Sequence, residues 1–424
     1  MLLVKDIRDN VATMKTSLSK RGWDESKVAI LDQIIELDDQ RKKMQTLSDA
    51  ELSKINTLSG EIGQLYKSGK ASEAEALKSQ IADIKTTNES YTTQLKEAEA
   101  NLKSHLLSVP NIPHESVPPG QTEDDNEVYK EWSDSLPVVD GSPHWDLGTQ
   151  YNILDFNLGN KIAGAGFPVF RGKGSRLQRA LINFFLDEST SAGYEEIVPP
   201  LLVNEDTARA TGQLPDKDGQ MYYCERDDLY LLPTAEVPIT NIHRGDLLTE
   251  DQLPIKLTGY TPCFRREAGS YGADVKGLNR VHQFDKIEII QVTTQDKSYE
   301  TLTQMLNHVE QLLVKLELPY RILRLCGGDL GFTSALTFDF EVYAAAQKRW
   351  LEVSSVSNFE TYQSNRLKLR YKDQSGKKHL AHTLNGSALA LARIIVALLE
   401  NNQTPEGIII PEVLRPYTGF DIIN

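Results

Sequence analysis

The sequence predicts an α+β protein in which a helical hairpin precedes one mixed domain of helices and strands. No proline occurs before Pro110, and Ala, Leu, Glu, Lys, Gln and Ser dominate that stretch. Prolines, a glycine and an acidic run then crowd residues 109–127, which is typical of a linker. From about Leu147 to Asn424, helical stretches mix with strand-like segments. The predicted divisions are therefore residues 1–108, a linker over 109–146, and a domain over 147–424.

The first division carries two apolar stripes with the spacing of a helix. One runs from Ile34 to Leu65 and the other from Leu77 to Leu102, with the turn Ser68-Gly69-Lys70 between them. Polar residues interrupt the stripes at Arg41, Ser48, Glu51 and Asn88. Two such stripes joined by a short polar turn predict an antiparallel coiled coil over about residues 27–103. Each helix would span about 35 to 40 residues.

Composition narrows the class of protein. The net charge of -14 opposes a nucleic-acid partner, but acidic and basic residues nearly balance up to residue 108, so the hairpin could still bind a polyanion locally. The three cysteines are widely spaced and form no CxxC pair, which favours a reducing cytoplasm and predicts no zinc site. No apolar run approaches the roughly 20 residues of a membrane span. We therefore expect a cytoplasmic protein without a membrane partner.

The segment from Tyr260 to Ile290 is the first that indicates chemistry. It reads as a strand, a loop with Gly272 and Gly277, and a returning strand. Because alternate residues of a strand share a face, Arg265 should lie with Glu267, and Phe284 with Lys286 and Glu288. Such a surface could clamp a phosphate, accept from an exocyclic amine and stack on a nucleobase. A solvated hairpin with cross-strand salt bridges remains the alternative.

A second segment, residues 384–400, is apolar on all sides from Ala388 to Leu399 apart from Arg393. This predicts a buried helix with a polar start at Asn385-Gly386-Ser387. A buried guanidinium needs an anionic partner. That partner is either a buried carboxylate or a ligand anion in a cleft, and the polar start favours the cleft.

Two shorter segments add oxygen ligands. Glu236 follows Thr234 and Ala235 in an apolar stretch between two prolines, and this segment taken alone favours a cap or turn role for Thr234. Glu352 and Ser354 should share one face of a strand, with Ser355 close by. A carboxylate and a hydroxyl form a weak Mg²⁺ ligand set, or a structural pair if no phosphate is present. The sequence contains no GxxxxGK[ST] loop and no HExxH motif.

Together these segments resemble the class II aminoacyl-tRNA synthetases, and specifically the bacterial seryl-tRNA synthetases, over nearly the whole chain. Residues 171–200 look like the first motif of the class, Phe264-Arg265-Arg266-Glu267 with its return strand like the second, and Gly386 to Arg393 like the third. Thr234-Ala235-Glu236 resembles the serine enzymes' own signature, and the hairpin resembles their tRNA-binding arm. The order and spacing of these motifs make the resemblance specific.

The resemblance implies an antiparallel sheet flanked by helices, a homodimer, and a serine–tRNA ligase that uses ATP with Mg²⁺. Arg265 and Arg393 would be the catalytic residues that bind phosphates, and Glu352 with Ser355 would hold Mg²⁺. The remaining residues fall into two implied sets. The ATP-binding set is Arg265, Arg266, Glu267, Val281, Phe284, Glu352, Val353, Ser354, Ser355 and Arg393. The serine-binding set is Thr234, Ala235, Glu236, Glu288, Asn385 and Ser387.

The implied partners are L-serine, ATP and serine tRNA, tRNA(Ser), with tRNA(Sec) left open as a further substrate. Serine carboxylate would attack the ATP α-phosphorus to give seryl-adenylate and pyrophosphate. The sequence does not divide the serine ammonium and hydroxyl between Glu236 and Glu288. Two other interpretations remain open: a ligase that loads a carrier protein, and a coiled-coil scaffold with an inactive catalytic domain.

Overall fold

A computed structural model describes residues 1–132, 135–216, 219–267 and 276–424. The chain forms two compact units, one of residues 1–19 with 23–110 and one of residues 20–22 with 111–424. Gly272 of the expected glycine-bearing loop lies outside the described residues. Among the described residues, no helix combines the length and the apolar character that a membrane crossing requires.

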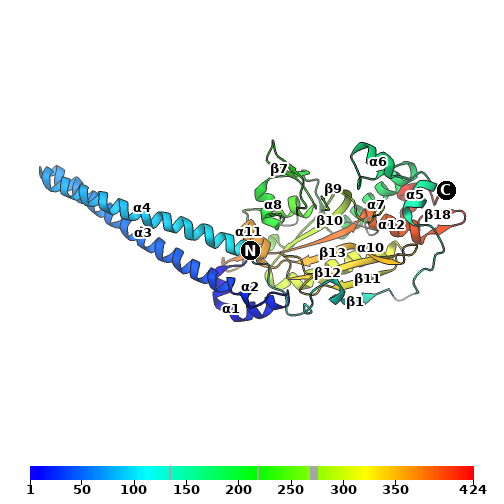
Figure 1. Ribbon diagram of the computed structural model, residues 1–424, viewed down its shortest axis with the longest axis horizontal. Helices are drawn as coiled ribbons and strands as arrows, with labels where there is room; N and C mark the ends of the chain where they lie inside the picture. Colours follow the sequence, from blue (N-terminus) through cyan, green and yellow to red (C-terminus); the bar gives the residue numbers. More distant parts are fainter. Residues whose placement is uncertain (133–134, 217–218, 268–275) are drawn as a thin grey trace. The chain divides into compact units, whose positions relative to one another are not determined.

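The first unit is helical, and its two longest helices form the predicted antiparallel hairpin (Figure 1). Its helices are α1 (Val4–Ser19), α2 (Glu25–Val28), α3 (Ile30–Lys67) and α4 (Ala71–Ser108). Both long helices have 38 residues, within the expected range.

Two polar interruptions of the stripes satisfy each other across the hairpin. The hydroxyl of Ser48, on α3, donates to Oδ1 of Asn88, on α4, at 2.8 Å. Ser48 is buried, so an apolar residue opposite would leave its hydroxyl unpaired. A buried polar pair at the seam fixes the register of the two helices, as single polar residues do in other coiled coils.

The second unit is built on an eight-stranded sheet, antiparallel except for one parallel pair between β4 and β9. In spatial order its strands are β1 (Glu127–Glu131), β11 (Tyr320–Arg324), β12 (Leu336–Ala344), β13 (Arg349–Asn358), β16 (His382–Ala390), β10 (Gln283–Thr293), β9 (Ile255–Phe264) and β4 (Glu195–Glu196). This antiparallel sheet with helices agrees with the fold that the resemblance implies.

The helices of this unit have the following bounds: α5 (His144–Gln150), α6 (Phe156–Ile162), α7 (Gly172–Ser191), α8 (Glu205–Thr211), α9 (Glu236–Thr240), α10 (Ser298–Lys315), α11 (Thr361–Leu367), α12 (Leu391–Asn401) and α13 (Arg415–Thr418). Short strands form four smaller sheets: β2 (Leu154–Asp155) with β3 (Val169–Phe170); β5 (Leu202–Val203), β7 (Leu229–Leu231) and β6 (Tyr223–Cys224); β15 (Lys378–Leu380), β14 (Arg370–Lys372) and β8 (Leu247–Thr249); and β17 (Gln403–Thr404), β18 (Gly407–Ile409) and β19 (Ile422–Ile423).

One core joins the main sheet to helices α7, α10 and α12. On β10, Ile287 and Ile289 are buried in this core, whereas Lys286 and Glu288 line a cavity on the other face. The alternation of a strand thus separates packing residues from polar ones, and it leaves the polar face available for a site.

Part of the expected linker belongs to the sheet. Strand β1 lies within residues 109–146 and pairs antiparallel with β11, with Glu127 opposite Arg324. The proline-rich stretch before it is also fixed, because Asn111 N donates to Phe332 O at 2.9 Å and His114 N to Ala335 O at 2.8 Å. Prolines remove their own N–H groups but leave those of their neighbours free to bond.

The predicted helix start at Asn385-Gly386-Ser387 is wrong, because these residues lie in β16 and the helix α12 begins at Leu391. Strand β16 is central in the sheet, between β13 and β10. Most of its residues are buried, so the strand shows no alternation of apolar and polar residues that would distinguish it from a buried helix. The strand places Ser387 directly opposite Glu288 and Asn385 opposite Ile290.

Candidate active site

The strand pair β9–β10 carries Arg265 and Glu267 into one cavity, as predicted. Strand β9 ends at Phe264, so both residues lie just beyond it, and Glu267 has a left-handed backbone with φ 48°. Arg265 Nε donates to Pro233 O at 3.3 Å, and its guanidinium lies 5.3 Å from the centre of the Phe284 ring. Glu267 forms an ion pair with Arg280.

Arg266 takes the opposite direction. Its guanidinium lies over the Tyr222 ring, 5.7 Å from the ring centre, and its backbone N–H donates to Gln220 O. It lines none of the cavities described below. Its expected contact with ATP therefore stays a prediction.

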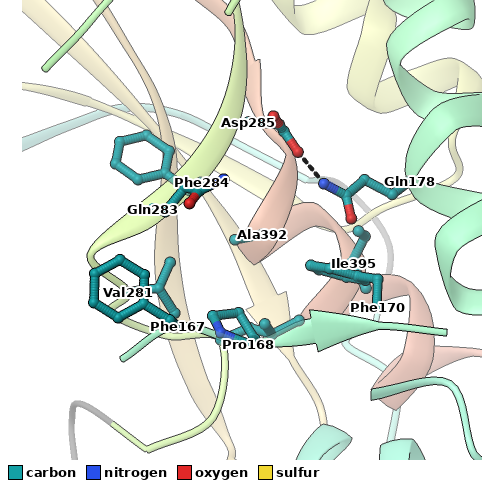
Figure 2. Close-up of a pocket in the computed structure, with 11 residues that line it drawn as sticks. Phe167, Pro168, Phe170, Gln178, Val281, Gln283, Phe284, Asp285, Ala392 and Ile395 are labelled. Carbon is teal, nitrogen blue, oxygen red and sulfur yellow. Dashed lines mark hydrogen bonds between the residues drawn. The ribbon is translucent and has the colours of Figure 1, made fainter. Parts of the chain in front are cut away.

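The returning strand β10 presents Phe284, Lys286 and Glu288 on one face, also as predicted. Figure 2 shows Phe284 and Asp285 on opposite sides of this strand, with Asp285 hydrogen-bonded to Gln178 of α7. The small cavity drawn there, of about 90 Å³, shares Phe284 and Val281 with a second cavity of about 190 Å³. The Phe284 ring therefore forms part of the wall of both.

The 190 Å³ cavity lies between the two predicted phosphate-binding arginines. Its lining includes Arg265, Glu267, Val281, Phe284, Glu352, Val353, Ser354, Ser355, Ser387 and Arg393. An adjoining cavity of about 720 Å³ shares Arg393, Glu352 and Ser355 and extends over the sheet toward β12.

Backbone carbonyls, more than carboxylates, hold Arg393. Its Nε donates to Asn279 O at 3.1 Å and its Nη1 to Glu352 O at 2.7 Å. The carboxylate of Glu352 is 3.7 Å from Nη1 and half exposed, so this ion pair is weak. Within the described part of the chain, no carboxylate forms an ion pair with Arg265. The geometry fits two guanidinium groups that complete their charge pairing with a ligand anion.

A cavity of about 460 Å³ contains the predicted serine-binding residues and shares Arg265, Glu267, Lys286, Ser355 and Ser387 with the 190 Å³ cavity. Thr234, Glu236, Glu288, Asn385 and Ser387 all line it. Ala235 does not, because it packs into an apolar cluster with Ile239 and Ile290.

Glu288 is fixed by two neighbours. Lys286 Nζ lies 2.6 Å from its Oε2, and the Thr234 hydroxyl donates to the same oxygen at 2.9 Å. Thr234 also accepts from Lys286 Nζ at 2.9 Å and from the backbone N–H of Glu236 at 3.2 Å. Thr234 therefore makes a turn hydrogen bond and also lines the cavity, while its contact with serine stays a prediction.

Sequence reasoning assigned no site role to Lys286 or Gln363, although both contact the carboxylates of this cavity. Gln363, from α11, donates to Glu236 Oε1 at 2.7 Å and accepts from Thr383 at 2.8 Å. The shared face of β10 had already placed Lys286 beside Glu288, and this was the signal that could have identified it. Gln363 lies in a separate helix and has no comparable local signal.

Burial and, after it, the negative charge of Glu288 raise the pKa of the Glu236 carboxyl to about 7, against the charge of Lys286 and hydrogen bonds from Gln363 and Asn385 that lower it. Lys286 pairs with Glu288 at close range, so among the described residues Glu236 is the carboxyl of this cavity without a cationic partner in contact. An ammonium group entering the cavity would stabilise its ionised form.

The predicted shared face of Glu352 and Ser354 is wrong, because a bulge interrupts β13. Phe340 pairs with Ser354 whereas the next residue, Glu341, pairs with Glu352, which leaves one extra residue on β13. The buried Ser354 hydroxyl donates to Ser387 O at 2.6 Å, while Ser355 joins Glu352 in lining the 720 Å³ cavity.

Asp339 adds a third oxygen to this wall. Its buried Oδ1 has no hydrogen-bond partner in the part of the chain that the structure describes, and both burial and the charge of Glu352 raise the pKa of this carboxyl well above its ordinary value. Oxygen atoms from the Glu352 carboxylate, the Ser355 hydroxyl and the Asp339 carboxyl, which is hydrogen-bonded to Ser355, suit a hard cation such as Mg²⁺. Among the described residues, however, no three His, Cys, Asp or Glu side chains form a complete metal site.

Comparison with known proteins identifies this arrangement. Residues 1–113 match the family model of the seryl-tRNA synthetase N-terminal domain, and residues 222–402 match the tRNA synthetase class II core domain (G, H, P, S and T). The serine–tRNA ligase of Salinibacter ruber is 48% identical over 99% of this chain and 98% of its own length. That of Thermotoga maritima is 45% identical over the full length of both chains.

The chain belongs to the seryl-tRNA synthetase family. It is accordingly a ligase of the aminoacyl-tRNA synthetase class that joins serine to transfer RNA. A crystal structure of the seryl-tRNA synthetase of Pyrococcus horikoshii, complexed with ATP, superposes with a TM-score of 0.90 at 33% identity, covering all of this chain and 99% of that one. The class II fold predicted from the resemblance is thereby confirmed.

The raised pKa of Glu236 predicts a pH dependence of stability in the substrate-free synthetase. Above the ordinary value of 4.5 the unfolded chain ionises Glu236, whereas the folded protein keeps it protonated up to about 7. Unfolding therefore releases a proton in this window, and stability falls as pH rises through it. Between about pH 5 and pH 8 the natural protein should lose about 1 to 3 kcal/mol relative to Glu236→Gln. Denaturant titrations measure this difference, and parallel pH profiles of the two proteins would contradict it.

Proposed function

We propose that the cavities between Arg265 and Arg393 bind ATP, that the adjoining 460 Å³ cavity binds L-serine, and that the two react there to give seryl-adenylate. The observation that carries this proposal is the arrangement of the two guanidinium groups around one cavity, without a strong carboxylate partner among the described residues. An arginine can clamp a phosphate through two hydrogen bonds, and a triphosphate offers several acceptors.

Each part of the nucleotide has a suitable partner. As the resemblance implies, Arg265 would hold the α-phosphate and Arg393 the γ-phosphate; in support, both arginines line the same cavity. The Phe284 ring would stack on adenine, Glu267 would accept from its amino group, and Val281 would line the pocket. A Mg²⁺ ion would be held by Glu352 and Ser355, with Asp339 nearby, and would supply positive charge to the phosphates.

The charges of the serine cavity divide the substrate's two polar groups. Lys286 already balances Glu288, which leaves that carboxylate to accept a hydrogen bond from the serine hydroxyl. Glu236 lacks such a partner and would pair with the serine ammonium. Alanine has no hydroxyl to donate to Glu288, so this buried carboxylate would lose the hydrogen bond that serine supplies, which is a strong penalty, and threonine must be excluded by size.

The reaction follows from this placement. The serine carboxylate attacks the α-phosphorus, the bond to the β-phosphate oxygen breaks, and pyrophosphate leaves. A carboxylate is already an anion, so no general base is required. The residues act by holding the two reactants in line and by neutralising phosphate charge through Arg265 and Arg393. A ribose hydroxyl at the end of the tRNA then takes the seryl group, and AMP leaves.

We propose that the hairpin of α3 and α4 binds tRNA(Ser) through its backbone and shape. Lysines occur along both helices, and exposed lysines suit contacts to phosphates. A homodimer is the proposed assembly, because apolar residues at the end of the first class motif and just after it are exposed in the single chain: Val198 is 86% exposed, and Leu201 and Leu202 are 38% and 42% exposed. The cytoplasm is the proposed location, in keeping with three free cysteines.

Replacing Glu288 tests the serine assignment. Glu288→Ala should abolish serine-dependent ATP–pyrophosphate exchange, by at least about hundredfold, because the serine hydroxyl loses its acceptor and Lys286 loses its partner. ATP binding, measured by calorimetry, should change little. Glu288→Gln is the matched variant, since it keeps the side-chain shape but removes the charge, and it should retain more activity than Glu288→Ala. Intact exchange in Glu288→Ala would refute the assignment.

Shortening the hairpin tests the tRNA assignment. Removing residues 49–87 and joining Ser48 to Asn88 through a short glycine linker keeps the remaining parts of α3, residues 30–48, and α4, residues 88–108, paired. Charging of tRNA(Ser) should fall about hundredfold or more because several phosphate contacts are lost. ATP–pyrophosphate exchange should be unchanged, since no residue of the cavities is removed. An equal loss of both activities would contradict a role in tRNA binding.

A further inference from the structure

Behind the nucleotide cavity, a histidine and a glutamate pair without any exposure to solvent. His144 opens α5 and Glu400 lies in the last turn of α12; the exposed fraction of both side chains is 0%. His144 Nδ1 is 2.8 Å from Glu400 Oε1, and the backbone N–H of His144 donates to the same oxygen at 3.1 Å. A fully buried pair of this kind needs every polar atom satisfied.

The other ring nitrogen of His144, Nε2, accepts a hydrogen bond from the segment that leads to β10. The backbone N–H of Leu278 donates to His144 Nε2 at 2.9 Å, so Nε2 must be the unprotonated nitrogen. Nδ1 therefore carries the ring hydrogen and donates it to Glu400. The carboxylate fixes the tautomer, and the tautomer provides an acceptor for Leu278.

Further contacts attach the segment 276–278 to the start of α5. Gly277 approaches the ring so closely, with φ +71°, that a Cβ there would lie 2.1 Å from His144 Nε2. Lys276 Nζ lies 4.3 Å from the centre of the Trp145 ring, a cation–π contact. This segment leads into β10, which carries Phe284 and Glu288.

The same network reaches Arg393 through Gln347. Gln347 Nε2 donates to Glu400 Oε1 at 2.8 Å, and its Oε1 accepts from Asn279 Nδ2 at 2.7 Å. The carbonyl of Asn279 then accepts from Arg393 Nε at 3.1 Å. The buried carboxylate of Glu400 thus acts along two routes. Through His144 it orients the backbone of Leu278, and through Gln347 it orients the side chain of Asn279.

We propose that His144, with Glu400 and Gln347, is a positioning residue for the phosphate-binding guanidinium of Arg393. The proposal rests on the proposed role of Arg393 in binding ATP. His144 lines none of the four cavities described above. It fixes Leu278 and Asn279, and Asn279 in turn presents the carbonyl that aims Arg393 into the cavity. Loss of the His144 acceptor should therefore weaken ATP binding. It should leave the serine cavity unchanged, because His144 does not line the cavity that contains Glu236 and Glu288.

Two amide substitutions separate positioning from packing. His144→Asn places an amide N–H near Glu400 but offers nothing at the Nε2 position, whereas the longer His144→Gln can still accept from Leu278. In ATP–pyrophosphate exchange with the full-length protein, His144→Asn should raise the KM for ATP about tenfold, the size expected when one buried hydrogen-bond donor is left unpaired. The KM for serine should stay within about twofold, and His144→Gln should restore most of the ATP affinity.

Gln347→Leu provides an independent test that does not disturb the core, since Gln347 is only partly buried. It should also raise the KM for ATP and spare that for serine. His308→Asn is the control for a half-buried histidine outside the network, because His308 contacts Ser189 and Tyr194 instead. This control should leave both KM values unchanged, even where the melting temperature falls.

The outcomes separate this proposal from the proposed function. If Arg393→Ala abolishes exchange while Gln347→Leu leaves the KM for ATP unchanged, the positioning role is overturned and the nucleotide site stands. Equal rises of both KM values in His144→Asn, or a His144→Gln variant no better than His144→Asn, would also overturn it. Normal exchange in Arg393→Ala would overturn the nucleotide site itself.

Discussion

The site depends on two guanidinium groups that the described protein leaves without a strong anionic partner. Arg265 is supported by Pro233 O and the Phe284 ring, and Arg393 by two backbone carbonyls. Neutral supports fix direction without cancelling charge, so the space between the two groups keeps a positive potential. A polyphosphate is the ligand that such a space favours, and preorganised positive charge is also what an adenylation transition state needs.

The cavity proposed for serine differs from the nucleotide cavity, because most of its charges are paired within the protein. Here a lysine and two carboxylates lie close together, and the lysine contacts one carboxylate. The other carboxylate, Glu236, is buried beside Gln363 with a pKa raised to about 7. In the proposed complex, an amino acid would supply the missing ammonium, and its carboxylate would meet Arg265, which also lines this cavity. On this proposal, one distribution of charge would both select the substrate and place the nucleophile.

The sequence predicted the features that follow from regular spacing of residues along one helix or strand. It did not predict the features that depend on how the strands pack in the sheet. Alternation along β10 was enough to place Phe284, Lys286 and Glu288 together, and the stripes of the hairpin predicted α3 and α4 closely. The sequence predicts a helix start where strand β16 lies, because both faces of this strand are covered and its apolar and polar residues do not alternate. Because of the bulge in β13, Ser355 shares a face with Glu352 and Ser354 does not. The sequence pattern of a strand does not reveal one extra residue of this kind.

Contacts between distant segments could not be predicted from the sequence either. Gln363 reaches Glu236 from α11, and His144 reaches Leu278 and Glu400 from a region that the sequence predicted as a linker. The polar residues of such segments look like ordinary surface residues until the fold brings them together. Resemblance to a family supplied the roles of the residues, and the physical arrangement supplies the reasons for those roles.

A crystal structure with a non-hydrolysable ATP analogue, in the absence of serine, tests the central claim most directly. Phosphate oxygens should lie within hydrogen-bonding distance of both Arg265 and Arg393, at about 2.7 to 2.9 Å, with the adenine against the Phe284 ring. A nucleotide bound elsewhere, or bound here with either guanidinium turned toward a protein carboxylate, would contradict the claim.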